Sequence, residues 1–377
     1  MGSVEKRVRD GKVTWLARWR DPAGVQRKRT FSRKYDAERL LTGVEHAQLT
    51  GAYVDPARSQ MTVGEWAAPW MAGRVHLKPK TVESYASLLR RRILPTWGTV
   101  PLTKVSHAAV VAWVAGMRAE GLSASRTRQA YHLLGAMLND AVKDRRLPVN
   151  PAAGVNLPRL PQTARRYLTH EQVAQLAEVC GPYRLLVLVL GYCGLRWGEV
   201  TALRVHHVDL MRGRLEVSEA VVEVSGRLIF GTPKSHQVRS VPVPRFLRDD
   251  LAGHLAGKGP GDLVFSSPRG AVLRVRNFRR GYFDPAAVEV GLDGLVPHEL
   301  RHTAASLAVA AGASVKGVQA MLGHASATLT LDRYGHLFGD ELDAVADRLD
   351  EAAGKARVPP ACPEPSVTPL DSRRARR

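Results

Sequence analysis

Residues able to do acid, base or nucleophilic chemistry gather in three segments of the second half of the chain. These segments read GLRWGE at residues 194–199, PHELRHTAAS at residues 297–306 and LGHASATLTLDRYGHLF at residues 322–338. A Gly-Thr-Pro-Lys-Ser turn at residues 231–235 adds a lysine. In chain order the candidate catalytic side chains are Arg196, Lys234, His298, Arg301, His324 and Tyr334. Two guanidiniums, an ammonium, two imidazoles and a phenol suit attack on a phosphodiester.

Arg196, Arg301 and Tyr334 are the residues on which this chemistry depends most. A phosphodiester under attack gathers negative charge on its non-bridging oxygens, which guanidiniums hold through forked, charge-assisted hydrogen bonds. We expect the two arginines to do this, a surface salt bridge being the alternative for each. Tyr334 would be the nucleophile. An unperturbed phenol has a pKa of about 10, so ionising it near pH 7.5 costs roughly 3.4 kcal/mol, much of which the arginines and nearby histidines can offset.

The order and context of these six residues resemble the catalytic signature of the tyrosine recombinases, the phage integrase family. The shared contexts are G-L-R-x-G-E, a basic hairpin with its lysine, H-x-L-R-H-T, L-G-H and R-Y-G-H. The resemblance is strongest over residues 165–340, looser over 61–157 and weakest over 1–55. It implies site-specific cutting and rejoining of DNA strands through a 3′-phosphotyrosine bond, with no cofactor, because the covalent bond stores the phosphodiester energy.

The same resemblance implies roles for the other polar residues of the three segments. Lys234 would be the general acid for the leaving 5′ oxygen, a solvated hairpin lysine being the alternative. His298 and His324 would hydrogen-bond the scissile phosphate or take part in proton transfer, although His324 could instead be a buried structural histidine. Glu199 would support the active-site histidine, and His302 would be a supporting residue.

The segment from His298 to His302 also reads H-E-x-x-H, the motif of zinc peptidases. On a helix this spacing would place two imidazoles on one face with Glu299 as the base, and His324 could in principle supply a third ligand. Alanines stand where the extended motif has its glycine and its third histidine. A peptidase would explain neither the arginines, the lysine and the tyrosine nor the charge of the chain, so we favour phosphodiester chemistry.

The charge of the chain points to a polyanionic partner. The 377 residues carry 55 Lys and Arg against 35 Asp and Glu, a net charge of +20, and each phosphate that a basic side chain neutralises releases counterions. Ribosomal proteins and membrane-surface binders are alternatives, but here the basic residues run along the whole chain. Three scattered cysteines suit a reducing compartment. With no signal peptide or membrane span in the sequence, we expect a cytoplasmic protein without a membrane partner.

Periodicity and linker composition divide the chain into several domains, mainly α with α+β parts. We expect an N-terminal arm-type DNA-binding domain over residues 1–55, a helical core-binding domain over 61–157, an α+β catalytic domain with a short sheet over 165–350, and a disordered basic tail over 358–377. By resemblance the first domain is a three-stranded sheet plus helix.

Local patterns predict individual elements within these domains. Alternation predicts strands over residues 13–20 and 25–31, with a turn between them and a helix over about 36–49. In the second domain Thr81 is expected to cap a helix that Pro95 ends, and Ser125 to start another helix.

Basic side chains outside the catalytic segments are candidates for contact with DNA. They are Arg18, Arg20, Arg27, Lys28, Arg29, Arg90, Arg91, Arg126 and Arg128. Their ordinary interpretation is a solvated charged face. The resemblance implies double-stranded attachment sites as substrate and a homotetramer on the synapsed DNA. It also implies integration or excision of a phage or mobile element, and a directionality factor or DNA-bending host protein as an additional partner.

Two other classes of DNA-acting protein remain open at this stage. A type IB topoisomerase-like enzyme would share the Arg, Lys, His and Tyr roles but would relax DNA without pairing two sites. A pure DNA-binding regulator would keep the charge and need none of the catalytic set. Strand exchange between two duplexes would distinguish a recombinase from the topoisomerase-like enzyme. Covalent trapping on DNA would distinguish it from the regulator.

Overall fold

The computed structural model describes residues 2–22, 24–50, 53, 60–161, 166–234, 237–338 and 341–356. The chain forms two compact units, one of residues 1–164 with 222–229 and the other of residues 165–221 with 230–377. The described residues pack into three separate hydrophobic cores, whose buried members lie within residues 17–53, 63–155 and 168–334. The tail expected over residues 358–377 lies outside the described residues. Among the described helices, none is long and apolar enough to cross a membrane.

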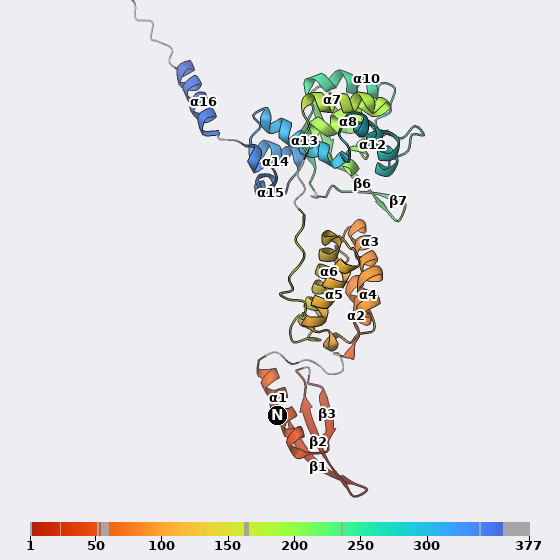
Figure 1. The fold of residues 1–377 in the computed structure, drawn as a ribbon, viewed down its shortest axis with the longest axis vertical. Coiled ribbons are helices and arrows are strands. Elements are labelled where there is room, and N and C mark those ends of the chain that lie inside the picture. Colours follow the sequence, from red (N-terminus) through yellow and green to blue (C-terminus); the bar gives the residue numbers. More distant parts are fainter. Residues whose placement is uncertain are drawn as a thin grey trace, which may run out of the picture. The chain divides into compact units, whose positions relative to one another are not determined.

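The N-terminal domain is an antiparallel sheet in the order β1-β2-β3, packed against one helix (Figure 1). Its elements are β1 (Ser3–Arg9), β2 (Lys12–Arg20), β3 (Gln26–Phe31) and α1 (Lys34–Leu49). Ala17 and Trp19 point to the same face of β2 because they are two residues apart, and they share a core with Leu41 of α1. The Trp19 indole donates to the Tyr53 hydroxyl at 3.0 Å. The expected three-stranded sheet plus helix is confirmed, including a first strand that the residue pattern had not marked.

The second domain is helical around its own core, as predicted. Its elements are α2 (Val63–Ala72), α3 (Pro79–Leu88), the π-helical turn η2 (Leu89–Ile93), α4 (Leu94–Trp97), the 3-10 turn η3 (Leu102–Lys104), α5 (His107–Ala119) and α6 (Ala124–Lys143). Residues such as Leu134, Met137, Leu138 and Ala141 are fully buried on α6, at the spacing of one helix face.

Three helix boundaries in this domain differ from the sequence prediction. Helix α3 begins at Pro79, before Thr81, because the fixed φ of proline suits a first helical turn. Pro95 does not end the helical path, since it lies in the first turn of α4, where a missing N–H is tolerated. The cap of α6 is Ser123, whose hydroxyl accepts from the Arg126 N–H at 3.3 Å, and not Ser125.

The third domain, expected from the sequence to be catalytic, is mainly helical and carries a small antiparallel sheet in the order β4-β5-β8. A two-stranded sheet, β6-β7, follows β5 in the chain, and its residues 222–229 group with the first compact unit. The domain's first half contains α7 (His170–Val179), η4 (Gly181–Tyr183), α8 (Arg184–Cys193), α9 (Trp197–Val200), η5 (Val205–His207), β4 (Val208–Asp209), β5 (Arg214–Val217), β6 (Ala220–Val224), β7 (Arg227–Gly231), β8 (Arg239–Pro242), η6 (Arg245–Leu247) and α10 (Arg248–Leu255). Its second half contains α11 (Val275–Phe278), η7 (Arg279–Phe283), α12 (Asp284–Glu289), α13 (Pro297–Ala310), α14 (Val315–Leu322), α15 (Ala327–Tyr334), η8 (Gly335–Leu337) and α16 (Glu341–Ala356).

Helix α8 is the centre of this domain. Its apolar run from Leu186 to Leu190 is buried throughout, and helices α7 and α13 pack against it (Figure 1). Because α13 carries the second catalytic segment and α8 leads directly into the first, this packing brings the two segments together. On the other side, β8 pairs with β5 through Leu215↔Val241 and Val217↔Arg239.

Candidate active site

The first catalytic segment makes a tight turn between α8 and α9, and glycine is required at two of its positions. Gly194 ends α8 with a φ of 64°, a left-handed conformation that favours glycine. A Cβ atom at Gly194 would also lie 2.8 Å from the Leu322 Cδ2 atom, and one at Gly198 would lie 2.4 Å from the Val221 carbonyl oxygen. The turn presents Arg196 as the residue immediately before α9.

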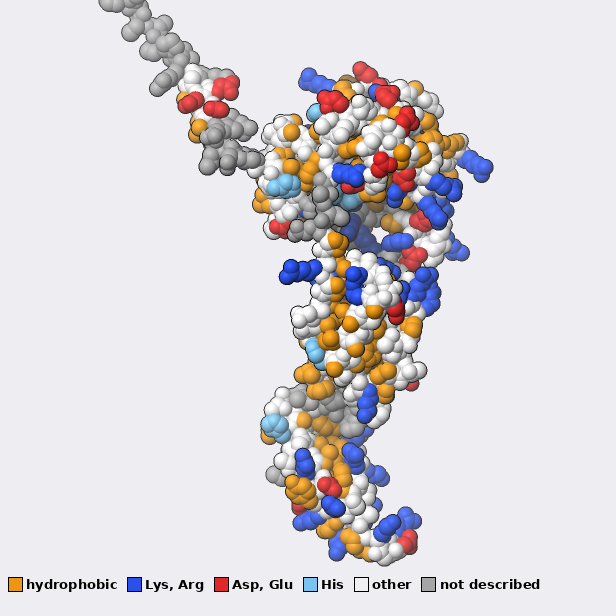
Figure 2. Space-filling view, in the orientation of Figure 1, with side chains coloured by type: hydrophobic (Ala, Val, Ile, Leu, Met, Phe, Trp, Pro, Cys, Tyr) orange, Lys and Arg blue, Asp and Glu red, His pale blue; other side chains and the backbone are white. Residues whose placement is uncertain are grey.

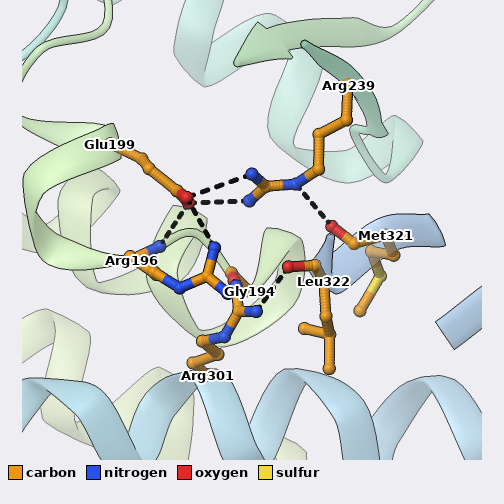
Figure 3. Close-up of polar contacts among 7 residues, drawn as sticks. All are labelled: Gly194, Arg196, Glu199, Arg239, Arg301, Met321 and Leu322. Carbon is orange, nitrogen blue, oxygen red and sulfur yellow. Dashed lines mark hydrogen bonds and ion pairs between the residues drawn. The ribbon is translucent and has the colours of Figure 1, made fainter. Parts of the chain in front are cut away.

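Glu199 is the buried centre of the charged network drawn in Figure 3. Its carboxylate accepts from the Arg196 backbone N–H and from the Arg196 Nη1 atom, both at 2.8 Å. The Arg239 Nη1 and Nη2 atoms donate to its two oxygens at 3.0 and 2.7 Å. Burial opposes ionisation of Glu199, but the hydrogen bonds and charge of Arg239, together with the contacts of Arg196, outweigh it and lower the pKa to about 2. Glu199 therefore supports an arginine of the site and not, as the sequence analysis expected, a histidine.

Arg239 is a residue that the sequence analysis missed. It lies on β8, and besides its forked contact with Glu199 it donates from Nε to the Met321 carbonyl oxygen at 3.1 Å (Figure 3). Its side chain is 8% exposed, so the contact with Glu199 is a buried ion pair. Arg239 thereby links β8, α9 and the end of α14. The signal that could have found it is Glu199 itself, because a carboxylate in an apolar segment needs a cation beside it.

Arg301 lies on α13 and is only 2% exposed. Its guanidinium donates to the backbone carbonyls of Gly194 and Leu322 (Figure 3), so it joins the second catalytic segment to the other two. Burial and the charge of Arg196 lower the pKa of Arg301 to about 9, and the guanidinium stays charged at neutral pH. The structure thus brings together the two arginines that the sequence analysis paired.

Tyr334 ends α15, is fully buried and lies among the histidines of the site. Its hydroxyl oxygen is 2.8 Å from the His302 Nδ1 atom, and its ring is parallel to that of His324, with the centroids 6.2 Å apart. As a phenolate, Tyr334 raises the pKa of the Arg301 guanidinium against the larger lowering effects. The phenol therefore lies near a cation and beside an imidazole nitrogen.

His324 and His298 are both held neutral by a lowered pKa. His324 is buried, and its Nδ1 atom is 2.9 Å from the Thr330 hydroxyl oxygen. Burial and the charges of Arg301 and Arg333 lower the pKa of His324 to about 4. The exposed His298 has its ring 5.3 Å from that of His302, and desolvation with the charge of Arg301 lowers its pKa.

Lys234 is exposed in the turn between β7 and β8. Its charge is among those that lower the pKa of His298, so the ammonium lies within electrostatic reach of the site. The structure thus places Lys234 near His298.

The H-E-x-x-H segment is used differently from a zinc site. Glu299 lies in the first turn of α13 and accepts from the Val296 N–H at 2.9 Å, so its carboxylate caps the helix. His302 is hydrogen-bonded to Tyr334. Within the described ranges, no three His, Cys, Asp or Glu side chains are grouped so that they could hold a metal ion.

The basic residues expected to contact DNA are spread over the first two domains. Figure 2 shows Lys and Arg side chains along the visible face of the molecule. On β3, Lys28 and Arg29 are exposed, whereas Arg27 forms an ion pair with Asp21 at 3.0 Å. Four other candidate side chains have a partner within their own domain. Arg18 forms an ion pair with Glu5, and the other three donate hydrogen bonds: Arg20 to the Gly24 carbonyl, Arg126 to the Gln129 side chain and Arg128 to the Pro158 carbonyl. The last two candidates, Arg90 and Arg91, are exposed on η2.

Comparison with known proteins identifies the family. The sequence profile of the phage integrase family matches residues 166–340. An integrase of Mycobacterium phage FRAT1 is 31% identical over 318 residues, covering 79% of this chain and 90% of the relative.

Two solved structures share the fold. The Tn1549 transposon integrase in complex with transposon right end DNA has a TM-score of 0.67 at 22% identity, covering 77% of this chain and 100% of that one. A lambda integrase tetramer bound to a Holliday junction has a TM-score of 0.57 at 19% identity, covering 86% and 96%. The chain belongs to the phage integrase family of tyrosine recombinases and is a site-specific DNA recombinase.

Proposed function

We propose that Tyr334 is the nucleophile and that it cleaves DNA by forming a 3′-phosphotyrosine bond. The observation that carries this assignment is the convergence of three separate segments on one site: the Tyr334 phenol beside Arg301, and Arg301 bonded to the turn that presents Arg196. The phenol oxygen attacks phosphorus, the bond from phosphorus to the 5′ oxygen breaks, and Lys234 gives that oxygen a proton. Attack by the 5′ hydroxyl of a partner strand then reverses the step.

The remaining side chains of the site divide between the phosphate and the protein framework. Arg196 and Arg301 hold the non-bridging oxygens, which gain charge during the attack. His298 and His324 are neutral at pH 7, so each can hydrogen-bond the phosphate without adding charge. Glu199 and His302 are supporting residues: Glu199 fixes Arg196, and His302 contacts the nucleophile.

The substrate and assembly follow from the same assignment. Two double-stranded attachment sites are cut and exchanged, to integrate or excise a phage or mobile element in the cytoplasm of the host. Four copies of the chain act on the synapsed DNA, as the lambda integrase tetramer on a Holliday junction suggests. A directionality factor or a DNA-bending host protein assists. The net charge of +20 supports an extended contact with DNA phosphates.

Covalent trapping tests the nucleophile. A suicide duplex with a nick near the cleavage site loses its short 5′-hydroxyl fragment after attack, so a covalent protein–DNA complex accumulates. We expect this complex with the unaltered chain and with the matched control Tyr192→Phe, whose hydroxyl is 2.8 Å from the His170 Nδ1 atom outside the site. No complex should form with Tyr334→Phe. A complex that survives Tyr334→Phe would contradict the assignment.

A strand-exchange assay with two differently labelled duplexes tests the pairing of two sites. Recombinant products that depend on Tyr334 support the recombinase. Relaxation of supercoiled DNA without any recombinant product would instead favour the topoisomerase-like alternative.

A further inference from the structure

The contact between His302 and Tyr334 has the geometry of a proton-transfer pair. The His302 Nδ1 atom and the Tyr334 hydroxyl oxygen are 2.8 Å apart, which is within the reach expected of a general base. Tyr334 is fully buried, so bulk water does not reach the phenol in this conformation. His302 is partly buried and comes from α13, the helix that also carries Arg301.

We propose that His302 is the catalytic base that takes the proton from Tyr334 during strand cleavage and returns it during rejoining. This inference rests on the proposed function, in which Tyr334 is the nucleophile. In cleavage the O–H bond of the phenol breaks, the proton moves to the Nδ1 atom, and the oxygen forms its bond to phosphorus as the 5′ oxygen leaves. In rejoining the phenolate leaves phosphorus and regains the proton from the imidazolium.

The hydrogen bonds of the neighbouring groups leave this role to His302. The buried imidazole of His324 lies parallel to the phenol ring with the centroids 6.2 Å apart, and its Nδ1 atom is hydrogen-bonded to the Thr330 hydroxyl. Arg301 points its guanidinium at the Gly194 and Leu322 carbonyls, and a guanidinium has no acceptor to offer.

The charges around the pair determine when the proton can move. Arg301 on α13, Arg333 on α15 and Arg196 before α9 all lower the pKa of both His298 and His324, the neighbours of the pair, and Lys234 lowers that of His298. The cations favour a phenolate and oppose an imidazolium. A full transfer before DNA binds is therefore unfavourable for the acceptor. Once a phosphate neutralises Arg196 and Arg301, that opposition falls, and the proton can move as the bond to phosphorus forms.

The test uses two substitutions that separate proton transfer from hydrogen bonding. In His302→Asn the amide oxygen takes nearly the position of the Nδ1 atom, so it keeps an acceptor for the phenol but cannot take its proton. His302→Ala removes both. The matched control is His170→Asn, because His170 makes a contact of the same 2.8 Å with Tyr192 outside the site. Circular dichroism and binding to the duplex establish that each full-length variant is folded.

Single-turnover trapping on the suicide duplex is measured between about pH 6 and pH 9. At about pH 7.5 we expect His302→Asn to be slower by roughly 10²-fold or more, the usual contribution of a general base. Its rate should rise with pH as hydroxide replaces the missing base, and added imidazole should accelerate His302→Ala. His170→Asn should stay within about twofold of the unaltered chain. Two results would overturn the proposal. One is a His302→Asn variant whose rate and pH profile equal those of the unaltered chain. The other is a His302→Ala variant that added imidazole does not accelerate and that cleaves as slowly as His302→Asn at every pH.

A second substrate shows on which oxygen His302 acts. With sulfur in place of the bridging 5′ oxygen, the leaving group needs no proton, so Lys234→Ala should recover its cleavage rate and His302→Asn should not. Recovery of His302→Asn on this substrate would place His302 on the leaving group and refute its role as base for the phenol. These failures differ from failure of the proposed function, in which the covalent complex would no longer depend on Tyr334.

Discussion

Removing Arg239 tests whether the buried network under Arg196 is held together as the structure shows. In Arg239→Gln, the Glu199 carboxylate stays buried but loses its forked partner. The difference between the ordinary pKa of 4.5 and the value of about 2 in the folded protein corresponds to roughly 3 kcal/mol in favour of the carboxylate. Loss of one partner of a buried pair costs about 3–5 kcal/mol. We therefore expect the free energy of unfolding of the catalytic domain to fall by about 3 kcal/mol at neutral pH.

The pH dependence has a definite sign. Because the folded pKa of Glu199 is lowered, its stabilising contribution is present above pH 4.5 and is lost as the pH falls toward about 2. Without Arg239 the buried carboxyl can take up a proton at a higher pH. The stability difference between Arg239→Gln and the unaltered chain should therefore shrink as the solution is acidified from pH 7.5 toward about pH 4.

Hydrogen exchange of the full-length chain at increasing urea concentrations measures this loss of stability. The exchange is followed in the peptides that cover residues 184–203 and 297–310. The control is Arg184→Gln, which loses ion pairs with Glu178 and Asp250 but whose side chain is 43% exposed; a loss below about 1 kcal/mol is expected there. Adding Glu199→Gln to Arg239→Gln should restore part of the stability. A loss below about 1 kcal/mol in Arg239→Gln, or strictly additive effects in the double variant, would refute the reasoning.

Three further predictions concern other parts of the molecule. Thr330→Val leaves the His324 Nδ1 atom without its hydroxyl partner, so the catalytic domain should lose about 1–2 kcal/mol in urea unfolding, and an unchanged midpoint would contradict this. The pKa of His324 is lowered to about 4 in the folded chain, so the neutral imidazole contributes stability above about pH 6.5, and this stability is lost as the pH falls toward 4. His324→Gln should therefore reduce the slope of the free energy of unfolding against pH across this range. A slope identical to that of the unaltered chain would contradict this. Deleting residues 1–55 should abolish integration on full attachment sites while leaving core-site binding intact in gel-shift assays, and unchanged integration would refute an arm-binding role.

The candidate catalytic residues could be picked out of the sequence because they lie in short local motifs, and the structure brings the segments that carry them together. The Gly194 turn, the His298–Arg301 spacing on α13 and the cap of α15 are each decided by neighbouring residues. Two strands of the N-terminal sheet were predictable for the same reason, since alternation along β2 marks Ala17 and Trp19 as inward-facing, whereas β1 was expected only from the family resemblance. Helix starts were less certain, because Ser123 and Ser125 offer equivalent capping side chains and only tertiary packing decides between them.

Contacts between distant strands and helices could not be predicted in this way. Arg239 reaches Glu199 across 40 positions, and His302 reaches Tyr334 across 32. In the sequence Arg239 is one of 55 basic residues, and nothing local distinguishes it from a solvated arginine on a strand. The motifs therefore point to the groups proposed to react, whereas the groups that contact them from distant segments are known only from the fold.

The charges of the site are arranged for a ligand that carries the missing negative charge. The Glu199 carboxylate accepts hydrogen bonds from both Arg196 and Arg239. Arg301 instead donates to two backbone carbonyls, which are neutral acceptors, within the described part of the chain. Its lowered pKa of about 9 reflects the cost of burying that charge beside Arg196. In the proposed mechanism a phosphate placed between the two arginines removes this cost, and the same neutralisation permits an imidazolium to form at His302. Under that proposal, the step that binds DNA is also the step that allows Tyr334 to lose its proton, so the phenol stays protonated until a substrate phosphate is in place.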